Sequence, residues 1–343
     1  FAHFLICTYA HFHIFERMMK KNLALLAGGY SGEYDVSIKS AAYIAQNIKA
    51  DKYDVYTILI SREKWVYVTE AGAELPVDKN DFSITLNGNK IKFDFAFITV
   101  HGTPGEDGKL QGYFDMLGIP YNTCDATTSA ITMNKAYTKA IVQGIEGLHT
   151  AKSMQLFHHN DIDVAAVVSR LKFPLFIKPN NGGSSVGMSK VHNIAGLGEA
   201  LEKAFHEDKQ ILVEEFIQGR EFSIGIVHLN GELKVLPATE IISSKEFFDY
   251  EAKYTAGVSK EITPANLTAE QNKTITHIVK DVYLRLNCHG MTRLDFILQE
   301  GTGDFYFIEI NTTPGQTEAS LIPQQVRAAG MDIVEFYDAL INP

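Results

Sequence analysis

The chain has 343 residues and a net charge of −10, with 45% hydrophobic and 21% charged residues. This composition is typical of a soluble globular protein, and the length predicts roughly two to three domains. No block of Lys and Arg is longer than Lys20-Lys21, which argues against a nucleic-acid-binding surface. The cysteines Cys7, Cys124 and Cys288 form no zinc or disulfide pattern, which predicts a reducing, cytoplasmic location.

The first 17 residues differ from the rest of the chain because they are rich in aromatic residues and His. Their charges, Glu16 and Arg17, follow the apolar part, whereas a signal peptide has the opposite order. The segment is also too short to span a membrane. We interpret residues 1–17 as a disordered leader or an artefact. The alternatives are a peripheral membrane anchor or a metal-binding tail with His3, His11 and His13.

An alternation of strands and helices follows, which predicts a parallel sheet with helices on its faces. The expected strands are Leu23–Ala27, Val55–Ile60 and Phe93–Val100, and a helical stretch runs from Val36 to Ile48. Ligands of such sheets bind beyond the carboxyl ends of the strands, where Gly28–Glu33 and His101–Gly108 fall. Because Gly28–Gly32 does not match G-x-G-x-x-G, we reject a dinucleotide site.

The middle of the chain predicts a phosphate-binding loop. After a break near Tyr121–Asp125 we expect a long helical stretch that contains Lys135, and then a small α/β unit over about residues 126–212. There, an apolar strand at Phe173–Phe176 leads into the Gly- and Ser-rich loop Lys178–Gly187. Backbone N–H groups and an ammonium in such a loop can bind phosphate oxygens, although the loop is not a P-loop.

The C-terminal part predicts a metal-binding hairpin between two helices, Ala269–Leu286 and Ile333–Ile341. Arg293–Ile297 and Phe307–Asn311 alternate apolar and polar residues like strands, and Gly301–Asp304 suits a turn between them. If their polar faces coincide, the oxygens of Asp295, Glu309 and Asn311 meet beside Arg293. Oxygen ligands of this kind suit Mg²⁺ or Mn²⁺ shared with a nucleotide. The alternative is a solvated strand face.

These features occur together with other motifs in an order that resembles one enzyme family. The motifs are Gly28–Ser37, His101–Gly108, Met133–Lys135, Lys178–Gly187, Tyr250–Tyr254, Arg293–Asp295, Glu309–Gly315 and Ser320-Leu321. From about Asn22 to Leu340, the chain is similar to D-alanine–D-alanine ligases of the ATP-grasp superfamily. The resemblance implies a mixed α/β ATP-grasp fold over about residues 139–341. The expected divisions are a substrate-binding domain (18–123), a central subdomain (124–212) and a C-terminal subdomain with the metal site and a lid (213–343).

The resemblance implies that the nucleotide site binds ATP with two Mg²⁺ (or Mn²⁺) ions held by Asp295, Glu309 and Asn311. Glu214 would accept a hydrogen bond from the adenine amino group, and Glu221 would bind the ribose. The remaining implied contacts are Lys135, Lys178, Ser184, Ser185 and Lys253 to phosphates, backbone groups of Glu215, Phe216 and Ile217 to the base, and the rings of Phe176 and Phe307 around it. For these rings, a place in the core is the alternative.

The resemblance also implies where the two D-alanine substrates bind. Glu33 would hold the ammonium of the first, with a helix N-terminal Glu as the alternative, and His101 would lie nearby or order its loop. Glu33, Ser184 and Tyr254 would close the pocket under a lid, and Tyr254 favours an amine over a hydroxyl acceptor. The remaining implied contacts are Arg293 and the Gly315 N–H to the oxyanion, and Ser320 and Leu321 to the carboxylate of the second D-alanine.

The implied reaction phosphorylates the first D-alanine and lets the amine of the second attack the acyl phosphate, for peptidoglycan synthesis. The implied assembly is a homodimer, with no membrane or nucleic-acid partner. Two departures from the family pattern are Gly182, where a Glu is usual, and Glu215, where many relatives have Lys. The alternatives are a D-alanine–D-lactate or other ATP-grasp ligase, a kinase-like phosphotransferase, and a catalytically silent nucleotide-binding protein.

Overall fold

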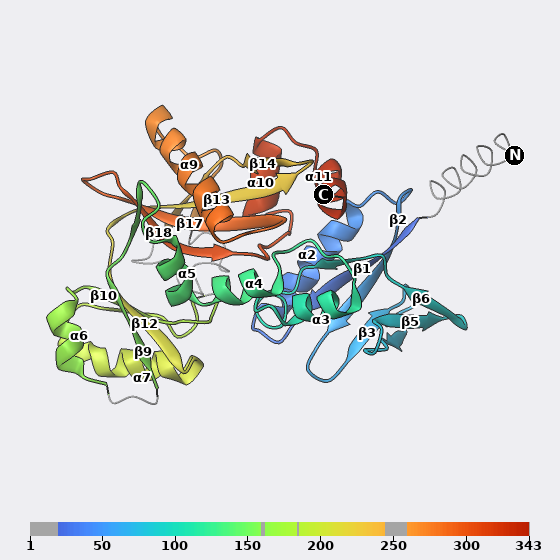
Figure 1. Ribbon diagram of the computed structural model, residues 1–343, viewed down its shortest axis with the longest axis horizontal. Coiled ribbons are helices and arrows are strands. Elements are labelled where there is room, and N and C mark those ends of the chain that lie inside the picture. Colours follow the sequence, from blue (N-terminus) through green and yellow to red (C-terminus); the bar gives the residue numbers. More distant parts are fainter. Residues whose placement is uncertain (1–19, 159–161, 184, 244–258, 343) are drawn as a thin grey trace, which may run out of the picture.

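The computed structural model describes residues 20–158, 162–183, 185–243 and 259–342 (Figure 1). The predicted leader at residues 1–17 lies outside these residues, as do Ser184, Lys253 and Tyr254. Within the described part, no helix combines the length and the apolar composition needed to cross a membrane.

The N-terminal part is built on a five-stranded sheet in the order β4-β3-β2-β1-β7. β1 pairs in parallel with both β2 and β7, as the alternation of strands and helices predicts. A two-stranded sheet, β5-β6, and two helices accompany it. The bounds are β1 (Lys21–Gly28), α2 (Tyr34–Gln46), β2 (Tyr53–Ile60), β3 (Trp65–Val68), β4 (Glu74–Pro76), β5 (Ser83–Leu86), β6 (Asn89–Lys92), β7 (Phe95–Ile98) and α3 (Lys109–Leu117).

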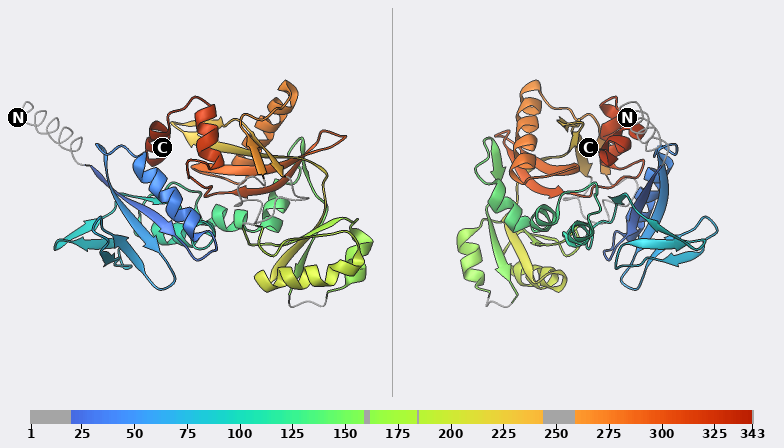
Figure 2. Two further views of the ribbon diagram at one scale, coloured as in Figure 1. Left: turned by 180° about the vertical axis from the view of Figure 1, so that it is seen from behind. Right: turned by 45° about the vertical axis from the view of Figure 1, so that its right-hand side comes forward.

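A four-stranded antiparallel sheet in the order β11-β10-β12-β9 forms the second layer. Helices α6 and α7 pack on it through a core that includes Val167, Leu197, Leu201 and Ile211. Figure 2 shows this layer at the end of the molecule opposite the first sheet. The bounds are β9 (Ser153–Phe157), α6 (Val164–Arg170), β10 (Leu175–Pro179), β11 (Ser189–Val191), η1 (Ile194–Gly196), α7 (Leu197–Glu207) and β12 (Gln210–Glu215).

The third layer is a seven-stranded sheet in the order β16-β15-β13-β17-β18-β8, with β14 beside β13. Helix α9 buries Ile275, Ile278, Val279 and Val282 against it, and its extent confirms the predicted amphipathic helix. The bounds are β8 (Leu148–Thr150), β13 (Gly219–Leu229), β14 (Glu232–Val235), β15 (Thr239–Ser243), β16 (Ser259–Ile262), α9 (Ala269–Arg285), β17 (Met291–Gln299), β18 (Phe305–Asn311), α10 (Leu321–Ala328) and α11 (Ile333–Ile341).

The C-terminal helix α11 closes the chain back onto the first sheet. Its Phe336 and Tyr337 share a core with Leu23 and Leu25 of β1. On the surface, Asp338 accepts hydrogen bonds from Lys49 Nζ at 2.9 Å, Lys52 Nζ at 2.6 Å and Tyr53 Oη at 2.6 Å. Burial would raise the pKa of Asp338, but these donors outweigh it and lower the pKa to about 2.

The long helix expected around Lys135 is wrong in one respect, because the chain forms two helices there. Helix α4 (Ala126–Met133) ends and α5 (Lys135–Val142) begins at Asn134, which has φ −89° and ψ 103°. The Asn134 side chain accepts a hydrogen bond from the N–H of Tyr137 at 3.0 Å. An Asn side chain that caps a new helix in this way favours an extended backbone over continued helix.

Candidate functional site

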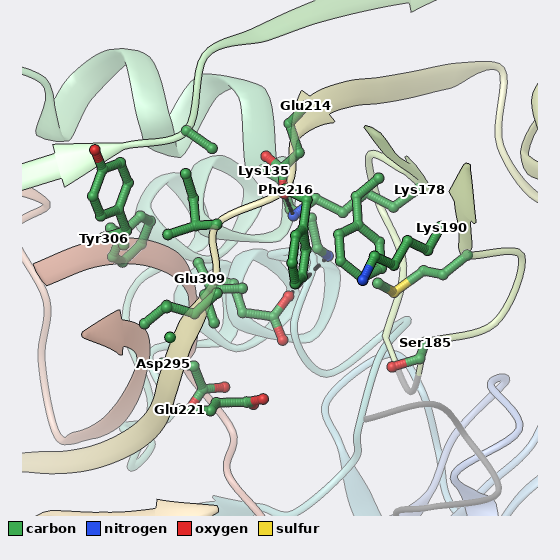
Figure 3. A pocket seen from close by; sticks show the side chains of 18 of the residues that line it. Lys135, Lys178, Ser185, Lys190, Glu214, Phe216, Glu221, Asp295, Tyr306 and Glu309 are labelled. Carbon is green, nitrogen blue, oxygen red and sulfur yellow. Dashed lines mark hydrogen bonds and ion pairs between the residues drawn. The ribbon is translucent and has the colours of Figure 1, made fainter. Parts of the chain in front are cut away.

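A cavity of about 700 Å³ lies between the four-stranded and seven-stranded sheets. Its volume is in the range of sites that bind small molecules. Figure 3 shows Lys135 and Lys178 in its upper part and the acidic side chains of Glu221, Asp295 and Glu309 below them. Predicted site residues that line it are Lys135, Phe176, Lys178, Ser185, Glu214, Glu215, Phe216, Ile217, Glu221, Asp295, Phe307 and Glu309.

The predicted metal ligands come from β17 and β18, which pair antiparallel. Arg293 lies directly across from Asn311, and Asp295 lies across from Glu309. Directly opposite residues of an antiparallel pair point to the same face of the sheet. The expectation that the polar faces of the two strands coincide is therefore confirmed. A β-bulge between Asp295 and Phe296 follows these residues along β17.

The charges of this set are balanced by basic neighbours. Arg293 binds Asp295 with two hydrogen bonds, from Nε to Oδ1 at 3.0 Å and from a terminal nitrogen to Oδ2 at 2.8 Å. Glu309 Oε2 lies 3.2 Å from Lys135 Nζ. Ser223 of β13 donates to Asp295 Oδ1 at 2.6 Å. Burial would lower the pKa of Arg293, but the neighbouring Asp295 raises it, so the guanidinium keeps its charge.

The residue types fit a divalent cation. In the described part of the chain, no three His, Cys, Asp or Glu side chains gather into a metal site. The set therefore depends on two carboxylates and the amide of Asn311, whose Oδ1 accepts from the N–H of Thr313 at 2.9 Å. These hard oxygen donors suit Mg²⁺ or Mn²⁺, which take further ligands from water and phosphate.

The phosphate-binding loop is anchored on the first turn of α5. Lys135 Nζ donates to the carbonyl of Gly182 at 2.5 Å, and the N–H of Ala136 donates to Asn180 Oδ1 at 2.9 Å. The N–H of Asn181 donates to Asp208 Oδ2 at 2.7 Å. The beginning of the loop is thus held by contacts of the Gly182 carbonyl, the Asn180 side chain and the Asn181 N–H.

Lys178 and Glu214 form an ion pair at the inner wall of the cavity. They lie on the paired strands β10 and β12, where Phe176 is the partner of Glu214 in register and Lys178 that of Leu212. Lys178 is 3% exposed. Burial would raise the pKa of Glu214, but the charges of Lys178 and Lys139 lower it to about 2. Glu214 is therefore an ionised acceptor.

Two backbone N–H groups at the end of β12 donate hydrogen bonds within the protein. The N–H of Glu215 donates to the carbonyl of Lys152 at 2.9 Å, and that of Phe216 donates to the carbonyl of Pro174 at 3.0 Å. The Glu215 side chain accepts from the N–H of Lys172 at 2.9 Å. The Glu215 side chain is thus bonded to the segment that precedes β10.

The predicted aromatic contacts have different surroundings. The rings of Phe176 and Phe216 lie 5.7 Å apart between centroids, and Lys190 Nζ lies 3.7 Å from the Phe216 centroid. Phe307 is 3% exposed and packs edge-on against Phe296 at 5.8 Å. Phe307 therefore belongs both to the cavity wall and to the core beneath it.

The loops predicted to hold the amino-acid substrates meet next to the metal set. His101 Nδ1 lies 2.8 Å from the carbonyl of Thr313, which follows Asn311 after β18. A Cβ added to Gly183 would lie 3.2 Å from Glu33 Oε2. The His101–Gly108 loop, the phosphate loop and the segment after β18 are thereby brought together near Glu33.

His101 is held as a neutral acceptor. Burial lowers its pKa, and the carbonyl of Thr313 requires the proton on Nδ1. Its Nε2 is then a lone pair, and this buried atom has no hydrogen-bond partner in the described part of the chain. Such an atom is available to accept a proton or a hydrogen bond from a ligand.

Ser320 lies at the start of α10, and Gly315 lies in the segment that precedes this helix. Ser320 is the N-cap of this helix, and its Oγ accepts from the N–H of Thr317 at 2.9 Å. A Cβ added to Gly315 would lie 3.1 Å from Ser320 Oγ, so the two residues approach closely. Leu321 is the first residue of the helix. The positive end of a helix suits a carboxylate, as predicted for these residues.

Sequence reasoning missed three residues that contact this site. Glu106 accepts from the N–H of Gly102 at 2.6 Å, and burial together with the charge of Glu33 raises its pKa to about 8. Ser223 orients Asp295, and Lys139 binds Glu214 Oε2 at 2.8 Å. The available signal for Lys139 is its spacing of four residues from Lys135, which places both on one helix face.

Comparisons with known proteins agree with this arrangement. The family described as "D-ala D-ala ligase N-terminus" matches residues 22–124, and "D-ala D-ala ligase C-terminus" matches residues 146–342. The chain is 44% identical over 322 residues to the D-alanine–D-alanine ligase of Flavobacterium johnsoniae, covering 94% of this chain and 98% of that protein. It is 44% identical over 324 residues to that of Parabacteroides distasonis, covering 94% and 97%.

Solved structures give the same result. The D-Ala:D-Ser ligase VanG of Enterococcus faecalis is similar with a TM-score of 0.85 and 34% identity, over 94% of this chain and 99% of that one. The D-alanine–D-alanine ligase of Bacillus anthracis, complexed with ATP, has a TM-score of 0.75 and 28% identity, over 94% and 96%. These matches confirm the resemblance seen in the motifs. The chain belongs to the D-alanine–D-alanine ligase family and has its ATP-grasp fold.

Proposed function

We propose that this chain joins two D-alanine molecules into D-alanyl-D-alanine at the expense of ATP, for peptidoglycan precursor synthesis. The γ-phosphoryl group of ATP is transferred to the carboxylate of the first D-alanine, which gives an acyl phosphate and ADP. The amine of the second D-alanine attacks the acyl carbon, and phosphate leaves. The reaction thus needs a nucleotide site and two amino-acid sites that meet at one point.

The observation that carries this proposal is the register of β17 and β18. Asp295 and Glu309 line the nucleotide cavity, and the opposite pair Arg293 and Asn311 lies one step along the same face. Thr313, two residues after Asn311, contacts His101 of the amino-acid loops. Phosphate transfer from the cavity to a carboxylate held near Glu33 is the chemistry that such a junction permits.

The nucleotide contacts follow from the cavity lining. Lys135 and Lys178, with the phosphate loop and Ser185, bind the phosphates, and Glu214 accepts from the adenine amino group. The N–H of Ile217 donates to the edge of the adenine ring, since the N–H groups of Glu215 and Phe216 are already bonded within the protein. The predicted ligands Asp295, Glu309 and Asn311 would hold two Mg²⁺ or Mn²⁺ ions, which would neutralise phosphate charge during in-line transfer.

The amino-acid contacts use the residues around Glu33. Its carboxylate binds the ammonium of the first D-alanine, and a charge-assisted hydrogen bond of this kind is short and strong. Arg293 and the N–H of Gly315 hold the oxyanion that develops on the acyl carbon. Removing one such donor typically lowers the rate by roughly 10²–10³-fold. Ser320 and the N-terminus of α10 at Leu321 bind the carboxylate of the second D-alanine.

His101 has the protonation state that the second step needs. An amine attacks only after it has lost a proton. A neutral imidazole can accept one at a buried Nε2 that has no hydrogen-bond partner among the described residues. Ser184, Lys253 and Tyr254 lie outside the described residues, and the contacts that the resemblance implies for them stay predictions. A homodimer, implied by the family resemblance, and a cytoplasmic location, inferred from the cysteine pattern, also stay predictions.

ATP-dependent phosphate release with identification of the product mass tests the proposal. We expect release and a dipeptide with D-alanine and neither with L-alanine. Release of ADP from ATP without any condensed product would contradict the proposal and favour a phosphotransferase. The assignments of Glu33 and Ser320 would fall first in that case, because a phosphotransferase has no use for a second amino acid.

The acceptor is the finer question, since VanG of Enterococcus faecalis is named a D-Ala:D-Ser ligase. Competition between D-alanine, D-serine and D-lactate for the second position separates the family's activities. We expect D-alanyl-D-alanine as the main product, in line with the relatives at 44% identity. A main product that contains D-serine or D-lactate would reassign the acceptor and leave the acyl phosphate step intact.

A further inference from the structure

A second buried lysine on α5 contacts the wall of the nucleotide cavity. Lys139 lies one helical turn after Lys135 and is 7% exposed. Its Nζ donates to the carbonyl of Ala151 at 2.9 Å, to Ser153 Oγ at 3.2 Å and to Glu214 Oε2 at 2.8 Å. An ammonium has three N–H donors, so each of them has an acceptor. The three hydrogen bonds hold the Lys139 side chain in place together with the three groups that accept them.

The three acceptors lie where the chain crosses between the two sheets around the cavity. Ala151 and Lys152 connect β8 of the seven-stranded sheet to β9 of the four-stranded sheet, and Ser153 is the first residue of β9. Glu214 lies near the end of β12, just before the chain returns to the seven-stranded sheet at β13. Lys139 therefore ties both crossings to α5, and Figure 1 shows α5 between the two layers.

The Glu214 carboxylate is held on both oxygens. Lys178 binds Oε1 and Lys139 binds Oε2. Two cations favour the ionised form, so Glu214 carries no proton to donate near neutral pH. Each carboxylate oxygen has a further lone pair for a ligand. A carboxylate fixed in this way is attracted to a hydrogen-bond donor and repels an acceptor.

We propose that Lys139 is a positioning residue for base selection: it holds Glu214 as a fixed acceptor that pairs with a 6-amino purine and rejects a 6-oxo purine. This inference rests on the proposed function, because it takes the nucleotide in the cavity to be ATP. Inosine triphosphate is the matched competitor, since it carries an oxygen where ATP carries the amino group. The same geometry rejects GTP, which also has an oxygen at this position.

A structural lysine without this role makes a different prediction. Loss of such a lysine would loosen both crossings and weaken all nucleotides alike. Loss of a positioning residue weakens ATP and lets the Glu214 carboxylate turn away, so that the 6-oxo purine is less strongly rejected. The ratio of the two dissociation constants separates the two roles, whereas the affinity for ATP alone does not.

The experiment measures the dissociation constants of Mg²⁺-ATP and Mg²⁺-inosine triphosphate by calorimetry without D-alanine. The variants are Lys139→Met and Lys139→Gln, and the matched control is Lys152→Met, which removes an exposed charge from the same crossing. We expect the preference for ATP to fall about tenfold in Lys139→Met, the change typical of losing one hydrogen bond to a recognising group, and to fall by a smaller factor in Lys139→Gln, which keeps a donor. The control keeps the preference of the unaltered protein.

Equal weakening of both nucleotides in the Lys139 variants, or no change at all, overturns the proposal. If Lys139→Met fails to fold, Lys139→Gln carries the test, because it keeps a donor for Glu214 without the charge. The KM for D-alanine is expected to stay constant in both variants. An unaltered protein that binds ATP selectively but makes no dipeptide would refute the proposed function alone, whereas one without preference for ATP would refute the role of Lys139.

Discussion

Substitution of Ser223 by Ala tests how the metal set is held. The Ser223 hydroxyl is fully buried on β13, lies across from Asp295 in register and donates to its Oδ1 at 2.6 Å. The two hydrogen bonds from Arg293 to Asp295 are untouched by the change. The variant therefore removes only the contact that fixes the carboxylate from the neighbouring strand.

The expected magnitude follows from that one bond. A hydrogen bond to a charged group contributes about 1.5–3 kcal/mol, so we expect the free energy of unfolding to fall by about 2 kcal/mol. Partners that orient a metal ligand typically change metal affinity or activity by roughly 10–100-fold. The Mg²⁺ concentration for half-maximal phosphate release should rise in that range, while the KM for D-alanine stays constant.

Phosphate release against Mg²⁺ concentration and urea denaturation without Mg²⁺ measure the two effects. Thr292→Val is the matched control, because Thr292 is fully buried next to Arg293 and its hydroxyl has no partner among the described residues. This control should leave the Mg²⁺ dependence unchanged and the stability equal or slightly higher. An Ser223→Ala variant with reduced stability and an unchanged Mg²⁺ dependence would refute Asp295 as a metal ligand.

Three further predictions concern Asn311, Glu106 and Asp338. Asn311→Ala should abolish turnover, since it removes the only amide of the metal set, and full activity would contradict the metal assignment. The fold should stay intact, with a loss of about 1–3 kcal/mol in urea denaturation because the N–H of Thr313 loses its acceptor. Glu106 has a folded pKa of about 8 against an ordinary value of 4.5, so the folded state binds the extra proton. Relative to Glu106→Gln, stability should therefore fall by about 2–4 kcal/mol as pH rises from 4.5 to 8, and a flat difference would exclude the raised pKa. Asp338→Asn should lower stability by about 1–2 kcal/mol at pH 7, after allowance for solvent screening of the lysines. Because the folded pKa is depressed to about 2, this difference should vanish as pH falls from about 4 to 2, and persistence there would point to packing instead.

The shared face of Arg293, Asp295, Glu309 and Asn311 was predictable from the sequence because strand periodicity fixes which residues lie on one face. Arg293 and Asp295 are two residues apart, as are Glu309 and Asn311, and the turn between the strands brings the two faces together. The bulge after Asp295 was not predictable, because it depends on how β17 fits between β13 and β18. A slip of one residue would have placed one of the two pairs in the core.

The ends of the helices around Asn134 and the role of Lys139 depend on local and tertiary signals of different kinds. Asn134 before Lys135 is a helix N-cap signal, so the break between α4 and α5 was within reach of sequence reasoning. Lys139 on a helix is typical of a solvated face. Only the packing of α5 against the two crossings buries it and gives it three acceptors.

Transfer of ¹⁸O from the carboxylate of labelled D-alanine to phosphate tests whether the reaction passes through an acyl phosphate. If ATP phosphorylates the first D-alanine and the amine of the second displaces phosphate, each dipeptide formed is accompanied by a phosphate that carries one ¹⁸O from that carboxylate. We expect labelled phosphate in an amount equal to that of D-alanyl-D-alanine, with both products identified by mass. Unlabelled phosphate, or labelled phosphate without dipeptide, would contradict this expectation.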